Sequence, residues 1–165
     1  MREQLRLDLV FAAALALCLA IAGRDVLALP IADRNAHAAS QILLRVMLFG
    51  YCGMGGLGVG LVHLVREADV ASAIGWPAGN PFHQEVAVAN ISLGVLGILT
   101  RWTGPEFWTA TAIGTSLFLL GAGVVHAVDV RRGGGRSRPN ASAIISIDLL
   151  APVVILGALV VFRST

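Results

Sequence analysis

Long apolar runs alternate with short polar segments along the chain, and this alternation is the strongest pattern in the sequence. A helix needs about 20 consecutive apolar residues to cross the hydrocarbon core of a bilayer. Runs close to this length predict five transmembrane helices, at about 8–29, 42–65, 81–101, 107–129 and 142–162. The pattern therefore predicts an all-α, polytopic membrane helix bundle in which residues 1–165 form a single domain.

The first apolar run has a competing interpretation. Its uninterrupted part, 9–23, is short, and Arg24 and Asp25 follow it. A basic start, an apolar middle and the segment Ala20-Ile21-Ala22 are also typical of a secretory signal with its cleavage site. We interpret the run as a membrane helix and expect Arg24 and Asp25 to pair at the membrane interface.

Composition agrees with a membrane protein and excludes other classes. Hydrophobic residues make up 56% of the chain, charged residues 13%, and the mean hydropathy is +0.79. A soluble domain has about a quarter of its residues charged, and a disordered chain has a low hydrophobicity. The twelve basic residues, all arginine, form no stripe of the kind that binds nucleic acid. The bilayer is the expected partner, and Cys18 and Cys52 are expected to be buried as small apolar side chains.

Arginine placement predicts the orientation of the five helices. The N-terminus and the segments after the second and fourth runs hold seven arginines, whereas the opposite side holds five. Cytoplasmic segments of membrane proteins carry the excess of basic residues. We therefore expect the N-terminus and the segment 131–138 in the cytoplasm and the C-terminus outside, in a bacterial inner membrane.

The second run is rich in glycine. It contains Gly56 and Gly60 at GxxxG spacing, a pattern that lets membrane helices approach closely. It lacks the strand and the lysine of a phosphate-binding loop. Two interpretations stay open: close packing against another helix, which includes a homo-oligomer through helix 42–65, or a gap that receives a ligand.

Ionisable and amide side chains in the apolar runs are the candidate functional residues. An ionisable group costs about 2.5–3.5 kcal/mol at the centre of an inserted helix, so each one calls for an explanation. Five such side chains fall near the cytoplasmic ends of their helices: His63, Glu85, Asn90, His126 and Asp148. We expect them to form one polar layer inside the bundle. On an ideal helix Glu85 and Asn90 are about 140° apart, so they cannot both face one point.

Four roles fit this polar layer, and one of them is the conduction of protons or ions. In acid–base catalysis on a small lipophilic molecule, His63 or His126 is the base, Glu85 or Asp148 the acid, and Asn90 an orienting donor. In a non-catalytic accessory subunit, the same side chains are hydrogen-bonding glue between helices. A metal site is the third, although no spacing places two ligands on one helix, and we assign no metal ligands. Whether the protein is an enzyme, and with which cofactor, stays undecided.

The segment 75–90, GWPAGNPFHQEVAVAN, resembles an uncharacterised family of small prokaryotic multi-spanning membrane proteins, loosely similar in size to the DoxX-like proteins. The resemblance extends over about 45–152 and includes a histidine at His63, a helix ending in His126, and the later residues Asn140, Asp148 and Pro152. It implies a helical membrane fold and adds Asn140 to the candidate ligand-binding residues, which already include Asn90, Gly56 and Gly60. It implies no particular activity.

Overall fold

The computed structural model describes residues 7–74, 76–132 and 139–164, with side chains for all of these except 7–8, 73–74 and 139–147. All regular structure in this part of the chain is helical. The elements, in chain order, are α1 (Leu7–Ala28), η1 (Ile31–Asp33), α2 (Ala36–Val46), η2 (Met47–Gly55), α3 (Gly56–Val65), α4 (Glu67–Ile74), α5 (Phe82–Leu99), η3 (Thr100–Trp102), α6 (Pro105–Arg131) and α7 (Pro139–Ser164).

Four helical segments are long and apolar enough to cross a membrane. They are Leu9–Ala28, Ala36–Val65, Phe82–Trp102 and Pro105–Arg131, each judged by length and composition. The predicted helical membrane bundle is thereby confirmed as a fold class. The fifth predicted span falls within α7, where the side chains of 139–147 lie outside the described residues, and it stays a prediction.

The second span begins at Ala36, before the apolar run that we placed at 42–65. Asn35 explains the earlier start, because its side-chain oxygen accepts a hydrogen bond from Ala38 N at 2.9 Å and caps the helix. Within this span, η2 is a π-helical segment that interrupts the α-helical path between α2 and α3. The hydropathy pattern does not predict this segment.

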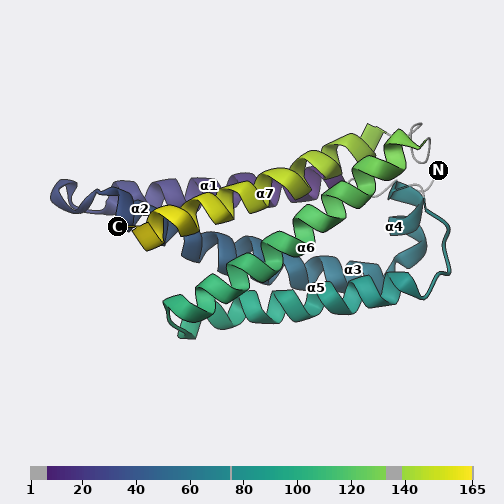
Figure 1. Ribbon diagram of the computed structural model, residues 1–165, viewed down its shortest axis with the longest axis horizontal. Coiled ribbons are helices and arrows are strands. Elements are labelled where there is room, and N and C mark those ends of the chain that lie inside the picture. Colours follow the sequence, from purple (N-terminus) through teal and green to yellow (C-terminus); the bar gives the residue numbers. More distant parts are fainter. Residues whose placement is uncertain (1–6, 75, 133–138, 165) are drawn as a thin grey trace.

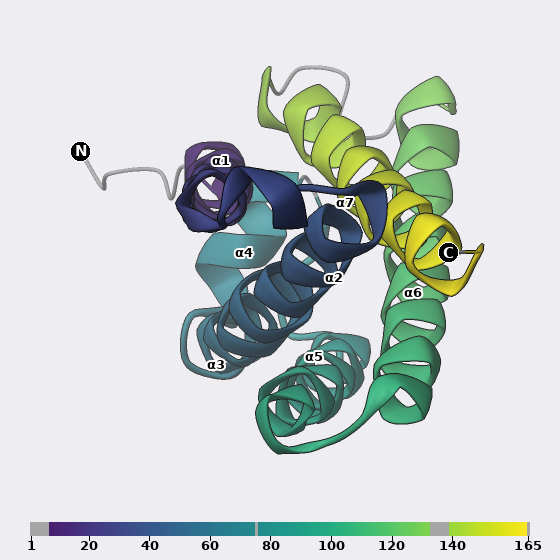
Figure 2. The ribbon, with the colours of Figure 1, turned by 90° about the vertical axis from the view of Figure 1, so that its left-hand side faces the viewer.

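Helix α3 packs mainly on α5, helix α6 packs mainly on α7, and α1 and α2 both contact α7. The α5–α6 hairpin is closed at its turn and open at the other end, where α4 lies across the gap (Figure 1). At the closed end, the indole Nε1 of Trp108 donates a hydrogen bond to the Thr100 carbonyl oxygen at 3.0 Å. Viewed along the bundle, α5 and α7 lie on opposite sides of α2 (Figure 2).

The densest core fills the half of the bundle near the closed end of the hairpin. Leu44, Met47 and Leu48, from α2 and η2, and Ile155 of α7 are all completely buried there. Trp108 and Phe162 join the same cluster, with their ring centroids 6.0 Å apart. The other half of the bundle, toward α4, contains the two cavities lined by His63.

Glycines bring η2 and α3 into backbone contact with α5. A Cβ atom built on Gly97 would lie 2.5 Å from Gly53 N, and one on Gly60 would lie 2.8 Å from the Ala87 carbonyl oxygen. Gly56 faces Asn90 and Gly94 in the same way. Gly56 and Gly60 therefore pack against a helix of their own chain, and a homo-oligomer through helix 42–65 would have to use other faces of that helix.

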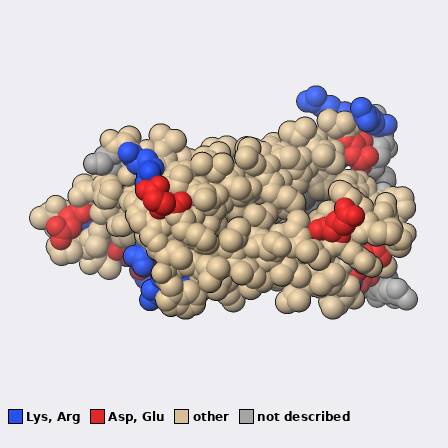
Figure 3. All heavy atoms as spheres, turned by 60° about the horizontal axis from the view of Figure 1, so that its bottom comes forward, with Lys and Arg blue, Asp and Glu red and all other residues tan. Residues whose placement is uncertain are grey.

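The surface distribution of charge fits a protein embedded in a bilayer. On the face shown in Figure 3, charged side chains gather at the two ends and an uncharged band separates them. Many large apolar side chains of the bundle are exposed, and Leu17, Leu117 and Val160 are more than 60% exposed. An apolar outer surface of this extent is stable against lipid tails rather than water.

Candidate functional site

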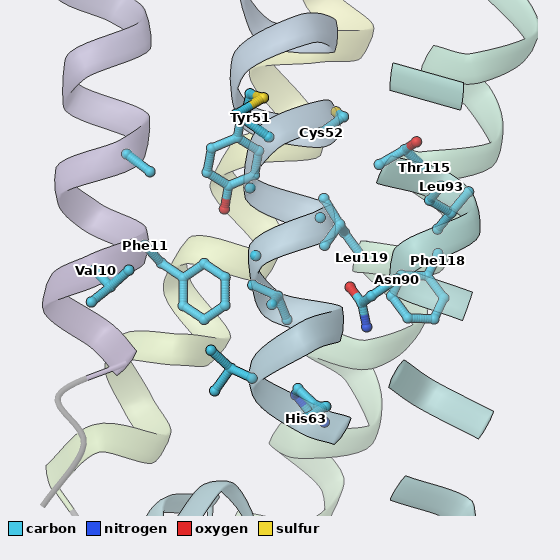
Figure 4. A pocket seen from close by; sticks show the side chains of 17 residues that line it. Val10, Phe11, Tyr51, Cys52, His63, Asn90, Leu93, Thr115, Phe118 and Leu119 are labelled. Atoms are coloured by element: carbon cyan, nitrogen blue, oxygen red, sulfur yellow. The ribbon is translucent and has the colours of Figure 1, made fainter. Parts of the chain in front are cut away.

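A cavity of about 320 Å³ lies between α1, η2, α3, α5 and α6 (Figure 4). Its wall is mainly apolar, with Phe11, Val59 and Phe118 among its lining residues. The polar side chains in this wall are Tyr51, Cys52, His63, Asn90 and Thr115. An apolar chamber with a few polar groups is the usual form of a small-molecule site.

The cavity lies between two helix pairs. Helix α3 packs mainly on α5, and helix α6 packs mainly on α7. Val10 of α1 and Met54 of η2 line the cavity and are also 60% and 58% exposed. These two residues mark where the cavity wall reaches the outer surface of the bundle. In a bilayer, that surface faces lipid.

The π-helical segment η2 places Tyr51 and Cys52 in the cavity wall. A π turn inserts an extra residue into a helix and shifts which side chains face inward, and such turns are frequent at functional sites. Both side chains are almost completely buried, and the Tyr51 ring is directed along the cavity toward the His63 end (Figure 4). Neither was among the predicted site residues, and the only signal in the sequence is the glycine-rich run around them.

His63 closes the other end of the cavity. It lies in the last turn of α3, one turn after Gly60, and Nδ1 of its ring is buried without a hydrogen-bond partner in the described structure. Buried polar atoms are nearly always paired, so an unpaired one calls for an explanation. Nearby, the Asn90 amide nitrogen donates to the Val86 carbonyl oxygen of its own helix at 2.9 Å, rather than to another helix.

A second, smaller cavity of about 100 Å³ shares part of this wall. His63 and Asn90 line both cavities, and the smaller one is also lined by His126 of α6 and Asp148 of α7. Four of the five side chains of the predicted polar layer therefore border one space. Gly123 allows α7 to approach α6 here, because a Cβ atom there would lie 3.0 Å from Cδ2 of Leu149, the residue after the buried Asp148.

Glu85 is the member of the predicted layer that the structure does not bring to this space. Its side chain is exposed in the first turn of α5, and it lines neither cavity. Asn90, 140° around the same helix, is the residue that faces inward. Of the glycines, Gly56 lines the larger cavity whereas Gly60 is buried against α5. The predicted Asn140 lies outside the described side chains.

Trp76 lies beside the smaller cavity on the side toward α4. Its ring centroid is 5.3 Å from that of His126 and 6.2 Å from that of His83. His83 is buried; its Nε2 lies 3.3 Å from the Pro77 carbonyl oxygen and 3.6 Å from Oε1 of Glu67. These contacts join the segment after α4 to both α5 and α6.

The family model that matches the chain covers residues 7–165. The chain belongs to DUF6790, a family of unknown function. No curated protein and no solved structure matches the chain. The expected membership of an uncharacterised family is confirmed, and the activity of this DUF6790 protein has to be argued from its site.

The same site bears on metal binding. Within the described residues, no group of three or more His, Cys, Asp and Glu side chains is placed to hold a metal ion. The site of this DUF6790 protein consists of the larger, mainly apolar cavity and the smaller cavity that His126 and Asp148 line. The two cavities share His63 and Asn90 in their walls. That arrangement suits a molecule with an apolar body and one hydrogen-bonding group.

Proposed function

We propose that this protein binds a small lipophilic molecule in the 320 Å³ cavity and acts on its polar group by acid–base chemistry. The observation that supports this most directly is the unpaired, buried Nδ1 of His63 in the cavity wall. A ligand hydroxyl, carbonyl or amine placed at this atom would complete its hydrogen bonding. The ligand body would then lie against the apolar side chains that make up the rest of the wall.

The size and position of the cavity support a lipophilic ligand. Its volume is within the range of about 300–1,000 Å³ that is typical of small-molecule sites. Exposed Val10 and Met54 place its opening on the apolar side of the bundle, so a ligand dissolved in the lipid would reach it without crossing water.

Acid–base chemistry is supported by the composition of the shared wall. His63 and Asn90 border both cavities, and His126 and Asp148 complete the smaller one. An imidazole and a carboxyl group around one space are a common pair for moving a proton to or from a bound group. We propose His63 as the group that contacts the ligand, Asn90 as an orienting group, and His126 with Asp148 as the proton reservoir.

The binding proposal is testable with 1-aminoanthracene, an apolar fluorescent amine, titrated into the protein in detergent micelles. Gly58 lines the cavity, and a Cβ atom built there meets nothing within 4 Å, so Gly58→Leu should fill the space without disturbing the fold. Gly114→Leu is the matched control, since its Cβ also meets nothing. Saturable binding that Gly58→Leu alone weakens supports the proposal. Equal binding by all three proteins contradicts it.

A non-catalytic accessory role is the second candidate, and the contacts of Trp76 favour it. Its ring contacts with His126 and His83, and its hydrogen bond to Asp129, tie three segments together without reference to a ligand. In this interpretation His63, His126 and Asp148 also serve to join helices. Ligand binding and the accessory role predict different changes in the free energy of unfolding when the His63 ring is removed.

We further propose that the protein lies in a bacterial inner membrane, with its N-terminus in the cytoplasm. The excess of arginines on the side of the N-terminus supports this orientation. The N-terminal end of α1 and the C-terminal end of α6 lie at the same end of the bundle as α4, whereas the C-terminal end of α7 lies at the other end (Figure 1).

A further inference from the structure

A third hollow, a groove, lies at the opposite end of the bundle. It shares no lining residue with the two cavities near α4. Its volume is about 480 Å³, and it is bordered by α1, α2, η2 and η3. Apolar side chains form its floor: Cys18, Ile21, Ile42, Val46 and Phe49. Gly50 also borders it, and the lack of a side chain there leaves room for Cys18, whose Sγ would lie 2.9 Å from a Cβ atom.

Two arginines border this groove, Arg45 in the last turn of α2 and Arg101 in η3. Neither forms an ion pair with an Asp or Glu in the part of the chain that the structure describes. Arg45 makes a cation–π contact with Trp108, since its guanidinium carbon lies 5.6 Å from the ring centroid. Both side chains are exposed, so both are open to a ligand.

The acidic residue at the groove has its own partner. Asp25 of α1 borders the groove, and its Oδ1 lies 2.7 Å from Nη2 of Arg24, as expected from the sequence. The charges around the groove, including Arg24, therefore sum to an excess of two positive charges. These two charges are those of Arg45 and Arg101.

The groove lies where a membrane interface is expected. Arg101 stands at the end of the candidate span Phe82–Trp102, and the next residue, Trp102, is 72% exposed. Exposed tryptophan at the end of a membrane helix is typical of the headgroup level. A groove with an apolar floor on the bilayer side and two arginines at this level matches a molecule with an acyl chain and an anionic headgroup.

We propose that this groove binds one anionic phospholipid, with an acyl chain along the apolar floor and the phosphate between Arg45 and Arg101. Arginine suits this role because its planar guanidinium group donates two parallel hydrogen bonds to a phosphate. The lipid would also supply the negative charge that the described residues around these two arginines do not. This site is independent of the ligand proposed for the cavity at His63.

Native mass spectrometry of the protein released from detergent micelles tests this proposal. The probes are dioleoyl phosphatidylglycerol, its zwitterionic counterpart dioleoyl phosphatidylcholine, and glycerol 3-phosphate as a headgroup without chains. We expect a single phosphatidylglycerol adduct at concentrations where the other two probes give none. The double variant Arg45→Gln/Arg101→Gln should weaken this adduct about thirtyfold, which corresponds to about 1 kcal/mol for each arginine near a membrane surface.

Arg131→Gln/Arg132→Gln is the matched control, because it removes the same charge at the other end of the bundle and should leave the adduct unchanged. If the double variant does not fold, each single variant is tested in its place, and its melting temperature shows whether it is folded. Equal adducts with phosphatidylcholine, or an adduct that the arginine variants leave intact, would overturn the proposal. Binding of glycerol 3-phosphate as tight as that of the lipid would assign a free phosphate instead. A dimer that dissociates in the variants would assign a second copy of the chain.

Discussion

Trp76 and Asp129 are joined by a hydrogen bond from the indole Nε1 to Oδ2 at 3.2 Å. The bond connects the segment after α4 to the last turns of α6, at the end where the α5–α6 hairpin is open. The Trp76 ring also lies against His126, a lining residue of the smaller cavity. The position of Trp76 therefore fixes the polar side of the candidate site.

We expect Trp76→Phe to lower the free energy of unfolding by about 1 kcal/mol, because it removes the hydrogen bond and keeps an aromatic ring. Unfolding in mixed detergent micelles, followed by circular dichroism, measures the change. Trp102→Phe is the control, since Trp102 is 72% exposed and the exchange should leave stability unchanged. Equal losses in the two variants would show that the bond to Asp129 does not hold this end together.

The backbone contact between η2 and α5 gives a second prediction. In Gly97→Ala the new methyl group would lie within 2.7 Å of three backbone atoms, two of Gly53 and one of Leu48. Backbone cannot move aside cheaply, so we expect a loss of about 1–3 kcal/mol in unfolding free energy. Gly114→Ala, on an open helix surface, should cost less than 1 kcal/mol. A Gly97→Ala protein as stable as the Gly114→Ala protein would contradict the close contact.

The helical membrane fold could be predicted because apolar runs report directly on bilayer thickness. Structural details that depend on single side chains could not be predicted in this way. Asn35 starts α2 before the apolar run begins, and this cap can be recognised in the sequence only when the helix start is already known. The glycines of the π-helical segment η2 pack against α1 and α5, and a hydropathy pattern does not contain such contacts.

The sequence predicts how far along its helix each candidate side chain lies, but not which way that side chain faces around the helix axis. His63, Asn90, His126 and Asp148 border one space, as their positions along the helices indicated. Glu85 has a similar depth but points outward. Helical geometry excluded a common direction for Glu85 and Asn90, yet the choice between them depends on how α5 is rotated against α3. Tyr51 and Cys52 were missed because the π turn determines that they face the cavity.

Orientation in the membrane gives a third prediction. Alkaline phosphatase, which is active only outside the cytoplasm, should be active when fused after Thr165, because the five predicted crossings would place the two termini on opposite sides of the membrane. The same enzyme fused within 131–138 should be inactive. A C-terminal fusion that is inactive, although the protein is expressed and stable, would contradict the arginine-based orientation or the five crossings.

His63 and His83 give the sharpest contrast between ligand binding and helix joining. Nδ1 of His63 has no partner in the described structure, so His63→Leu should leave the free energy of unfolding within about 1 kcal/mol of the wild type. His83 is buried against the Pro77 carbonyl oxygen and Glu67, so His83→Leu should cost about 1–3 kcal/mol. If His63→Leu proves as destabilising as His83→Leu, His63 joins helices and the accessory role is favoured.

Photolabelling tests the central claim, that the cavity at His63 holds a small lipophilic molecule, most directly. The probe is octanol carrying a diazirine, which has an apolar chain and one hydroxyl group. The protein in lipid nanodiscs is irradiated with this probe, and the labelled residues are mapped by peptide mass spectrometry. We predict adducts on buried cavity residues such as Tyr51 and Cys52, strongly reduced in Gly58→Leu and unchanged in Gly114→Leu. Labels confined to the outer apolar surface, at equal levels in all three proteins, would contradict the account.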